Sequence, residues 1–261
     1  MSKFTLYRMR PYSHWLVFVV SFAILAASIS LTLLWPSGSI ALDNETMQNG
    51  TSSAWGNYQS PQQCRECHQA EFEAWTDTTH ARATFDPIFQ TYLQDVDQPG
   101  ECFACHTTGY DTTTGQFVLA GVTCEACHGP YRAEHPQESM MIAASAELCG
   151  SCHAGTLAEW QSSRHGAVGV SCIDCHEVHT QQTRAAASTN ALCATCHQDQ
   201  IQDPTHSPHI EANVHCIDCH LARPNDDGSG AVNGHAVTGH SFAVFVKTCD
   251  DCHPNSLFSE Y

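Results

Sequence analysis

The segment CGSCHAGTLAEWQSSRHGAVGVSCIDCH (residues 149–176) contains two copies of the pattern C-x-x-C-H with one further histidine, His165, between them. Residues 193–236 repeat residues 149–192 at an offset of 44, and His209 takes the place of His165. A sequence repeat of this length indicates a structural unit that packs against its neighbour. The chain therefore contains a duplicated module, and the C-x-x-C-H pattern within it decides the fold.

All 16 cysteines of the 261-residue chain belong to eight copies of this pattern. The cysteines are Cys64, Cys67, Cys102, Cys105, Cys124, Cys127, Cys149, Cys152, Cys172, Cys175, Cys193, Cys196, Cys216, Cys219, Cys249 and Cys252. The histidines that close the motifs are His68, His106, His128, His153, His176, His197, His220 and His253. Structural zinc sites, thioredoxin-like redox pairs and disulfides also use C-x-x-C, but none of them requires a histidine next. C-x-x-C-H is instead the signature of covalent haem c attachment.

Haem chemistry explains the spacing of each motif. Two residues in a tight helical turn separate the thiols by the distance between the two vinyl groups on one edge of the porphyrin. The next residue then brings its imidazole to the iron. We therefore expect eight covalently bound haem c groups, each with one axial histidine from its own motif.

Histidines outside the motifs are candidates for the second axial position. One of them, His14, adjoins an apolar N-terminal segment, which leaves nine. The nine are His80, His135, His165, His179, His206, His209, His215, His235 and His240. His80, His165 and His209 each follow a motif histidine by 12 residues, and this shared offset indicates ligands. Nine candidates for eight positions predict that every iron is bis-histidine ligated.

The number of residues available for each haem predicts the fold class. Roughly 25 residues per haem are too few for an ordinary side-chain core. We predict a mainly α protein with much irregular structure, in which short helices and loops wrap around a chain of eight haems. Met140 and Met141, the alternative ligands, and Trp75 and Trp160 are expected to pack against haem rings. The apoprotein should accordingly fail to fold.

The N-terminal segment predicts the compartment. Residues 15–35 carry no charge, are long enough for one transmembrane helix and follow three basic residues. The predicted division is a cytoplasmic N-terminus at 1–14, a transmembrane anchor at 15–35, a flexible tether at 36–62 and the octahaem domain at 63–261. The haem domain should then lie in the periplasm or outside the cell. The alternative is a cleaved signal peptide, since Ser39, Ile40 and Ala41 could form a cleavage site.

Several segments resemble known families of multihaem cytochromes. CFACHTTGYDTTTGQFVLAGVTCEACHGPYRAEH (residues 102–135) resembles the paired-haem segment of the cytochrome c554 and hydroxylamine oxidoreductase superfamily, whose GP-x-x-x-H histidine is a distal ligand. That resemblance implies a ligand role for His135. SSRHGAVGVSCIDCHEVH and SPHIEANVHCIDCH (beginning at Ser162 and Ser207) resemble paired motifs of periplasmic multihaem electron carriers and octahaem reductases. There the S-x-H histidine is an axial ligand, which implies His165 and His209 rather than His206.

TGHSFAV (residues 238–244) resembles the distal-ligand segment of the same group and implies His240. The chain also departs from these families. It has no lysine in place of a motif histidine, as many nitrite reductases do, and it is far shorter than hydroxylamine oxidoreductases. In the second repeat Arg223 replaces His179, so the missing ligand must come from elsewhere, with His235 and His215 as the candidates.

Composition and ligation together predict an electron carrier without catalytic residues. Ten basic against 27 acidic residues give a net charge of −17, which argues against nucleic acid and suits a redox partner with a basic docking face. Closely spaced haems with filled axial positions suit electron transfer, whereas an enzyme needs an open or displaceable position. We expect transfer from a membrane donor, such as a quinol-oxidising protein, to a periplasmic or extracellular acceptor. The alternatives are a reductase or oxidase of small nitrogen or sulfur compounds, and a homo-oligomer or haem filament.

Overall fold

The computed structural model divides the chain into two units, Met1–Asp43 and Asn44–Tyr261. The residues that it describes are 57–97, 100–140, 142, 145–184, 188–223, 235, 237–250 and 252–253. The predicted transmembrane segment at 15–35, its cleavage site and most of the predicted tether lie outside these residues. Within the described part, no helix combines the length and the apolar character needed to cross a membrane.

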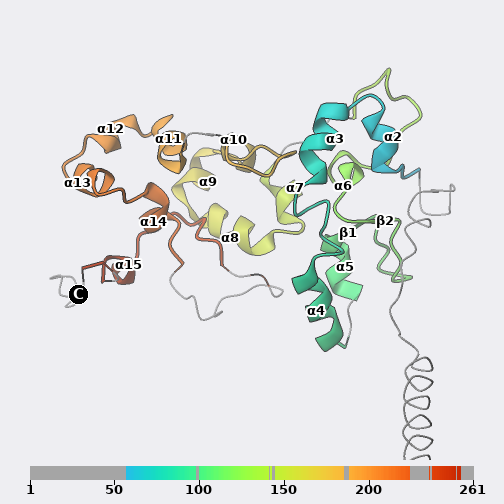
Figure 1. Ribbon diagram of the computed structural model, residues 1–261, viewed down its shortest axis with the longest axis horizontal. Helices are drawn as coiled ribbons and strands as arrows, with labels where there is room; N and C mark the ends of the chain where they lie inside the picture. Colours follow the sequence, from blue (N-terminus) through green and yellow to red (C-terminus); the bar gives the residue numbers. More distant parts are fainter. Residues whose placement is uncertain are drawn as a thin grey trace, which may run out of the picture. The chain divides into compact units, whose positions relative to one another are not determined.

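The second unit consists of short helices joined by irregular segments (Figure 1). In chain order its elements are α2 (Pro61–Arg65), α3 (Gln69–Thr76), α4 (Pro87–Asp95), α5 (Gly100–His106), β1 (Thr107–Thr108), β2 (Leu119–Ala120), α6 (Cys124–His128), α7 (Ala146–Gly150), α8 (Ala154–Ser162), α9 (Arg164–Val168), α10 (Cys172–Cys175), α11 (Thr189–Ala194), α12 (Gln198–Ile201), α13 (Ser207–Glu211), α14 (Cys216–His220) and α15 (Val246–Asp250). The predicted mainly α fold with much irregular structure is confirmed for this unit.

Each described C-x-x-C-H motif contains a helical turn, as the haem chemistry requires. The backbone N of the motif histidine donates to the carbonyl of the first cysteine, at 2.8 Å in His68, 2.9 Å in His153 and 2.7 Å in His253. This bond places both cysteines on one side of the turn. Side-chain caps fix where some turns begin: the Asp174 carboxylate accepts the backbone N of Ser171 at 2.7 Å.

Apolar side chains form only a small core among the described residues. Phe89, Leu119 and Ala146 are the buried hydrophobic residues. This pattern agrees with a fold in which the prosthetic groups supply most of the apolar interior. Phe89 lies flat against the ring of His106, with ring centres 3.8 Å apart and planes 3° apart.

Buried threonines link the first three motifs. Thr84 Oγ1 accepts the backbone N of Gly121 at 2.7 Å and donates to the carbonyl of His106. Thr108 Oγ1 donates to the carbonyl of Gly121 at 2.9 Å and accepts the backbone N of Thr123 at 2.8 Å. Strands β1 and β2, antiparallel with Thr108 opposite Leu119, belong to this network. The segment between the second and third motifs is therefore fastened to the loop that follows His80.

Candidate haem-binding sites

Seven motif histidines each face a histidine from outside the motifs. The pairs and their distances between ring centres are His68 with His135 at 5.9 Å, His106 with His235 at 5.8 Å, His128 with His179 at 6.5 Å, His153 with His80 at 5.9 Å, His176 with His240 at 6.3 Å, His197 with His165 at 5.8 Å and His253 with His209 at 6.1 Å. Every pair joins one motif histidine to one of the nine candidates.

These distances fit two imidazoles that share one metal ion. Two metal–nitrogen bonds of about 2 Å on opposite sides of an ion put the ring centres about 6 Å apart. Rings in direct contact would lie closer, as His106 and Phe89 do at 3.8 Å. The paired residues therefore fit a haem held between them, with the cysteines of the motif at its edge.

Ring nitrogens of several of these histidines are already engaged. The Nδ1 atoms of His106, His128 and His209 lie 3.0, 2.7 and 3.0 Å from the carbonyl oxygens of Ala83, Met140 and Thr205, respectively. Nδ1 of His135 lies 3.1 Å from the carbonyl of Glu138. An Nδ1–H that donates to a carbonyl leaves the Nε2 lone pair for a metal, which is the usual arrangement of ligating histidines.

Burial favours the neutral imidazole, the form that binds metal. It lowers the pKa of His80, and the nearby His153 lowers it further. Burial likewise lowers the pKa of His153 and of His176. His220, the motif histidine of the seventh motif, has the same kind of ring contact as His106 and His128: its Nδ1 lies 3.2 Å from the carbonyl oxygen of Phe242.

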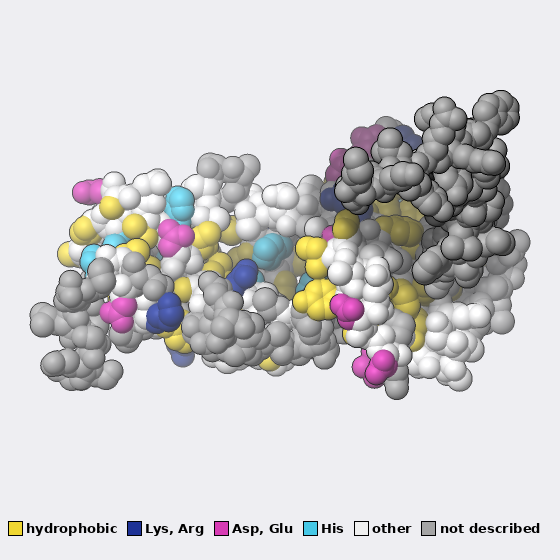
Figure 2. All heavy atoms as spheres, turned by 60° about the horizontal axis from the view of Figure 1, so that its bottom comes forward, with side chains coloured by type: hydrophobic (Ala, Val, Ile, Leu, Met, Phe, Trp, Pro, Cys, Tyr) yellow, Lys and Arg dark blue, Asp and Glu magenta, His cyan; other side chains and the backbone are white. Residues whose placement is uncertain are grey.

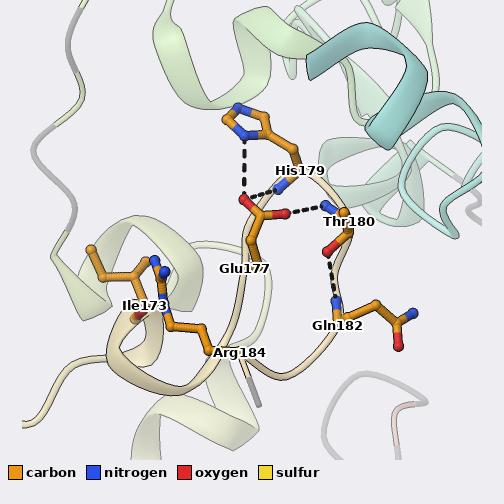
Figure 3. A network of polar contacts seen from close by, with 6 residues as sticks. All are labelled: Ile173, Glu177, His179, Thr180, Gln182 and Arg184. Atoms are coloured by element: carbon orange, nitrogen blue, oxygen red, sulfur yellow. Dashed lines mark hydrogen bonds and ion pairs between the residues drawn. The ribbon is translucent and has the colours of Figure 1, made fainter. Parts of the chain in front are cut away.

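A compact loop after the fifth motif presents His179 (Figure 3). The Glu177 carboxylate accepts the backbone N of Thr180 at 2.7 Å and of His179 at 3.3 Å, and its Oε1 lies 3.5 Å from His179 Nδ1. Burial opposes ionisation of Glu177, but the bonds from Thr180 and His179 hold the pKa of this carboxyl below its usual value. Arg184 Nε donates to the carbonyl of Ile173 and closes the loop against α10. Sequence reasoning identified His179 and missed Glu177.

A buried carboxylate, that of Glu125, organises the segment that carries His135. Glu125 is the second residue of the third motif and accepts the backbone N of Gln59 at 2.8 Å and of Tyr131 at 2.7 Å. Burial raises the pKa of Glu125, although both bonds lower it. Tyr131 Oη donates to the carbonyl of His135 at 3.1 Å. The third motif therefore helps to place the histidine that faces the first motif.

Two tryptophans make equivalent contacts with the segments that precede a later motif. Trp75 Nε1, on α3, donates to the carbonyl of Val122 at 2.9 Å, and Trp160 Nε1, on α8, donates to that of Val170 at 2.8 Å. Each carbonyl lies two residues before the first cysteine of a motif. The sequence predicted only that these tryptophans pack against haem rings. In the structure each also donates a hydrogen bond that positions the segment before a motif.

Cysteines of different motifs that lie near one another show which motifs are neighbours in space. The Cys124 thiol lowers the pKa of Cys64, and burial together with the thiols of Cys172 and Cys216 raises the pKa of Cys149 and of Cys193, respectively, to about 11. The first cysteines of motifs one and three, four and five, and six and seven are therefore neighbours.

Second cysteines connect these three pairs to one another. Burial and the Cys152 thiol raise the pKa of Cys127, and the thiol of Cys196 contributes to the raised pKa of Cys175 after burial. Cys249 acts in the same way on Cys219. Motifs one, three, four, five, six, seven and eight thus neighbour one another in that order. The second motif is a side branch at the fourth, where burial and Cys152 raise the pKa of Cys105 to about 11.

Of the histidines that the structure describes, His206, His215 and His220 lie outside the seven pairs. Among the described histidines, none faces His220 at the distance found in the pairs. Of the nine candidates, His206 and His215 belong to no pair, and their Nδ1 atoms lie 3.3 Å from Asp203 and 3.9 Å from Asp218. His235, one candidate for the second repeat, lies against His106 instead.

The surroundings of the motifs carry neither disulfides nor a preformed ion site. None of the 16 cysteines forms a disulfide, which leaves every motif thiol for a thioether bond. In the part of the chain that the structure describes, no group of three or more His, Cys, Asp or Glu side chains could hold a metal ion. The face in Figure 2 shows histidine side chains at the surface among apolar ones.

Comparison with known proteins agrees with the motifs. Residues 63–129 match the family described as cytochrome c554 and c-prime, and residues 117–158 and 165–202 match the family described as doubled CXXCH motif. The chain is 31% identical over 124 residues to cytochrome c-554 of Nitrosomonas europaea, covering 38% of this chain and 51% of that protein. It is 24% identical over 135 residues to the multiheme cytochrome MtrA of Shewanella baltica, covering 43% of this chain and 40% of that protein.

The motifs, the short helices and these similarities define the class of the protein. The chain is a multihaem c-type cytochrome that binds haem c through CXXCH motifs. More particularly, it resembles the cytochrome c554 family over its first three motifs and the doubled CXXCH family over its third to sixth motifs. The matched segments span about half or less of the two curated relatives.

Proposed function

We propose that the chain is an octahaem electron carrier on the non-cytoplasmic side of a membrane. The observation that carries the proposal is the set of seven facing histidine pairs. Each pair would fill both axial positions of one haem, and a haem with two strong-field imidazole ligands exchanges electrons without binding substrate at its iron. The remaining haem, which has no such pair, would be attached at the seventh motif through Cys216 and Cys219, with His220 as its motif ligand.

The chain's own residues hold and orient the groups. The motif turns would fix each haem by two thioether bonds, and backbone carbonyls such as those of Ala83 and Thr205 fix the orientation of imidazoles. The bound haem would supply a one-electron couple between ferric and ferrous iron. Because seven motifs neighbour one another in a series and the second motif neighbours the fourth, an electron would pass between haems at neighbouring motifs.

The location and the partners belong to the same proposal. Residues 15–35 would anchor the domain, and residues 36–62 would let it move between a membrane donor and a periplasmic or extracellular acceptor. A quinol-oxidising membrane protein is a suitable donor. The net charge of −17 favours a partner with a basic docking face, whereas nucleic acid would be repelled. Stacking of copies into a filament remains compatible with this role.

The test is a count of haems and electrons on the purified holoprotein. Mass spectrometry should find eight haems joined through 16 thioether bonds, and a reductive titration should take up eight electrons per chain. Electron paramagnetic resonance should be dominated by low-spin ferric signals. Five or six haems with titratable thiols would contradict the octahaem proposal. A large high-spin signal that shifts with nitrite, hydroxylamine or cyanide would instead favour a reductase or oxidase.

A further inference from the structure

One carboxylate from a distant helix holds the turn that carries His240. Glu159, on α8, accepts the backbone N of Thr238 at 3.2 Å and of His240 at 2.9 Å. The same carboxylate accepts the Thr238 hydroxyl at 2.7 Å. Thr238 Oγ1 also lies 2.9 Å from His240 Nδ1 and 3.1 Å from Thr156 Oγ1. Glu159 therefore contacts both the backbone of His240 and the residue that contacts its ring.

These contacts form a chain from imidazole to carboxylate. An imidazole that binds metal through Nε2 carries its proton on Nδ1, so His240 would donate to Thr238 Oγ1. That hydroxyl has a single proton, and the Glu159 oxygen at 2.7 Å is its closest acceptor. The order of donors is then His240 to Thr238 to Glu159, ending on a negative charge.

Helix α8 also holds the opposite side of the same site. Trp160, next to Glu159, donates through Nε1 to the carbonyl of Val170 at 2.8 Å, just before α10. Helix α10 leads directly into His176, whose ring centre lies 6.3 Å from that of His240. Two adjacent residues of α8 therefore position the segments that carry both histidines.

We propose that Glu159, acting through Thr238, is a positioning residue that orients His240 and lowers the redox potential of the haem attached at Cys172 and Cys175. The inference rests on the proposed function, because it takes His176 and His240 as the two axial ligands. A carboxylate at the end of a hydrogen-bond chain makes the imidazole a stronger electron donor, which stabilises ferric iron. Neither Glu159 nor Thr238 belongs to a haem motif.

Two conservative substitutions distinguish the effect of the hydrogen-bond chain through Thr238 from the effect of the negative charge on Glu159. Thr238→Val keeps the carboxylate and the side-chain shape but removes the hydroxyl, whereas Glu159→Gln keeps the size and removes the charge. Glu71→Gln is the matched control, since it removes the same charge from an exposed position on α3. His240→Ala identifies the resonance signal that belongs to this iron.

The measurement is a redox titration of each full-length holoprotein, followed by electron paramagnetic resonance. Thr238→Val and Glu159→Gln should each raise the midpoint potential of one haem and shift the g values of one low-spin signal, the one lost in His240→Ala. The other signals and the Glu71→Gln protein should match the parent. Unchanged spectra and potentials in Thr238→Val would overturn the inference, as would equal shifts in Glu159→Gln and Glu71→Gln. Either result leaves the electron count, and with it the proposed function, standing.

Discussion

At the scale of single residues, small side chains decide whether a ligand histidine reaches its position. Gly121 has a φ of +79°, and a Cβ at this residue would lie 2.6 Å from the carbonyl oxygen of Ala81 and 3.2 Å from that of His80. The backbone of Val122 donates to the same His80 carbonyl at 2.9 Å. The strand before the third motif therefore lies directly against the residue that faces His153.

Gly121→Ala should consequently destabilise the holoprotein. The positive φ alone costs an alanine about 1–2 kcal/mol, and the contact with Ala81 adds roughly 1–3 kcal/mol. Gly115 is the control, because its φ is +70° but a Cβ added there would meet nothing within 4 Å. Denaturant unfolding should show a larger loss for Gly121→Ala than for Gly115→Ala. Equal losses would mean that the close approach at Gly121 does not matter.

At the scale of elements, the same tryptophan contact recurs after two motifs, the first and the fourth. Helices α3 and α8 each follow a motif histidine, and each uses a tryptophan to hold the segment that begins a later motif. The two donors are equivalent in sequence, seven residues after His68 and His153. The segments after the first and fourth motifs therefore share a contact between elements as well as the haem attachment itself.

Trp75→Phe and Trp160→Phe should each lower stability by about 1–3 kcal/mol, because each leaves a partly buried carbonyl without its donor. The two losses should add within about 0.5 kcal/mol, since the two contacts share no residue. Tyr92→Phe serves as the control, because Tyr92 is 61% exposed on α4. The measurement compares denaturant midpoints of the parent, the three single variants and the Trp75→Phe/Trp160→Phe double variant, all as holoproteins. A loss confined to one tryptophan would show that the two contacts are not equivalent.

At the scale of the whole molecule, the second axial ligand of the haem at the seventh motif, opposite His220, remains a prediction. Bis-histidine ligation of every iron needs one ligand beyond the seven pairs. The sequence leaves His235 and His215 as candidates, and because His235 faces His106, we predict that His215 is this ligand. His215→Ala should then convert one iron to the high-spin form, seen as a new signal that integrates to about one-eighth of the total. His206→Ala is the matched control and should leave the spectrum unchanged. A high-spin signal already present in the parent protein would contradict complete bis-histidine ligation.

The compartment is the second prediction at this scale. If residues 15–35 remain as an anchor, cell fractionation should recover the haem protein with the membranes, and its N-terminus should include this segment. High salt should not release it, because the attachment is apolar. Soluble protein that begins near Leu42 would instead demonstrate signal cleavage and leave a diffusing carrier.

Haem attachment could be predicted from the sequence because its chemistry is local. Two thiols and an imidazole within five consecutive residues reach one haem through a single helical turn, so the motifs alone specify where each group binds and that the helices are short. The candidate distal histidines were also identifiable, because only nine remained outside the motifs and the N-terminal segment. The duplicated module followed directly from the offset of 44.

Which histidine faces which motif was decided by the tertiary structure alone. His80 follows the first motif in sequence, yet its ring lies against His153 of the fourth; His165 likewise faces His197. A distal position lies on the far side of a flat ring from its motif, so the chain must fold back from another module to reach it. Spacing along the sequence cannot specify that return path. It depends on contacts between segments far apart, such as the bond from Trp75 to Val122 and the three bonds to Glu159.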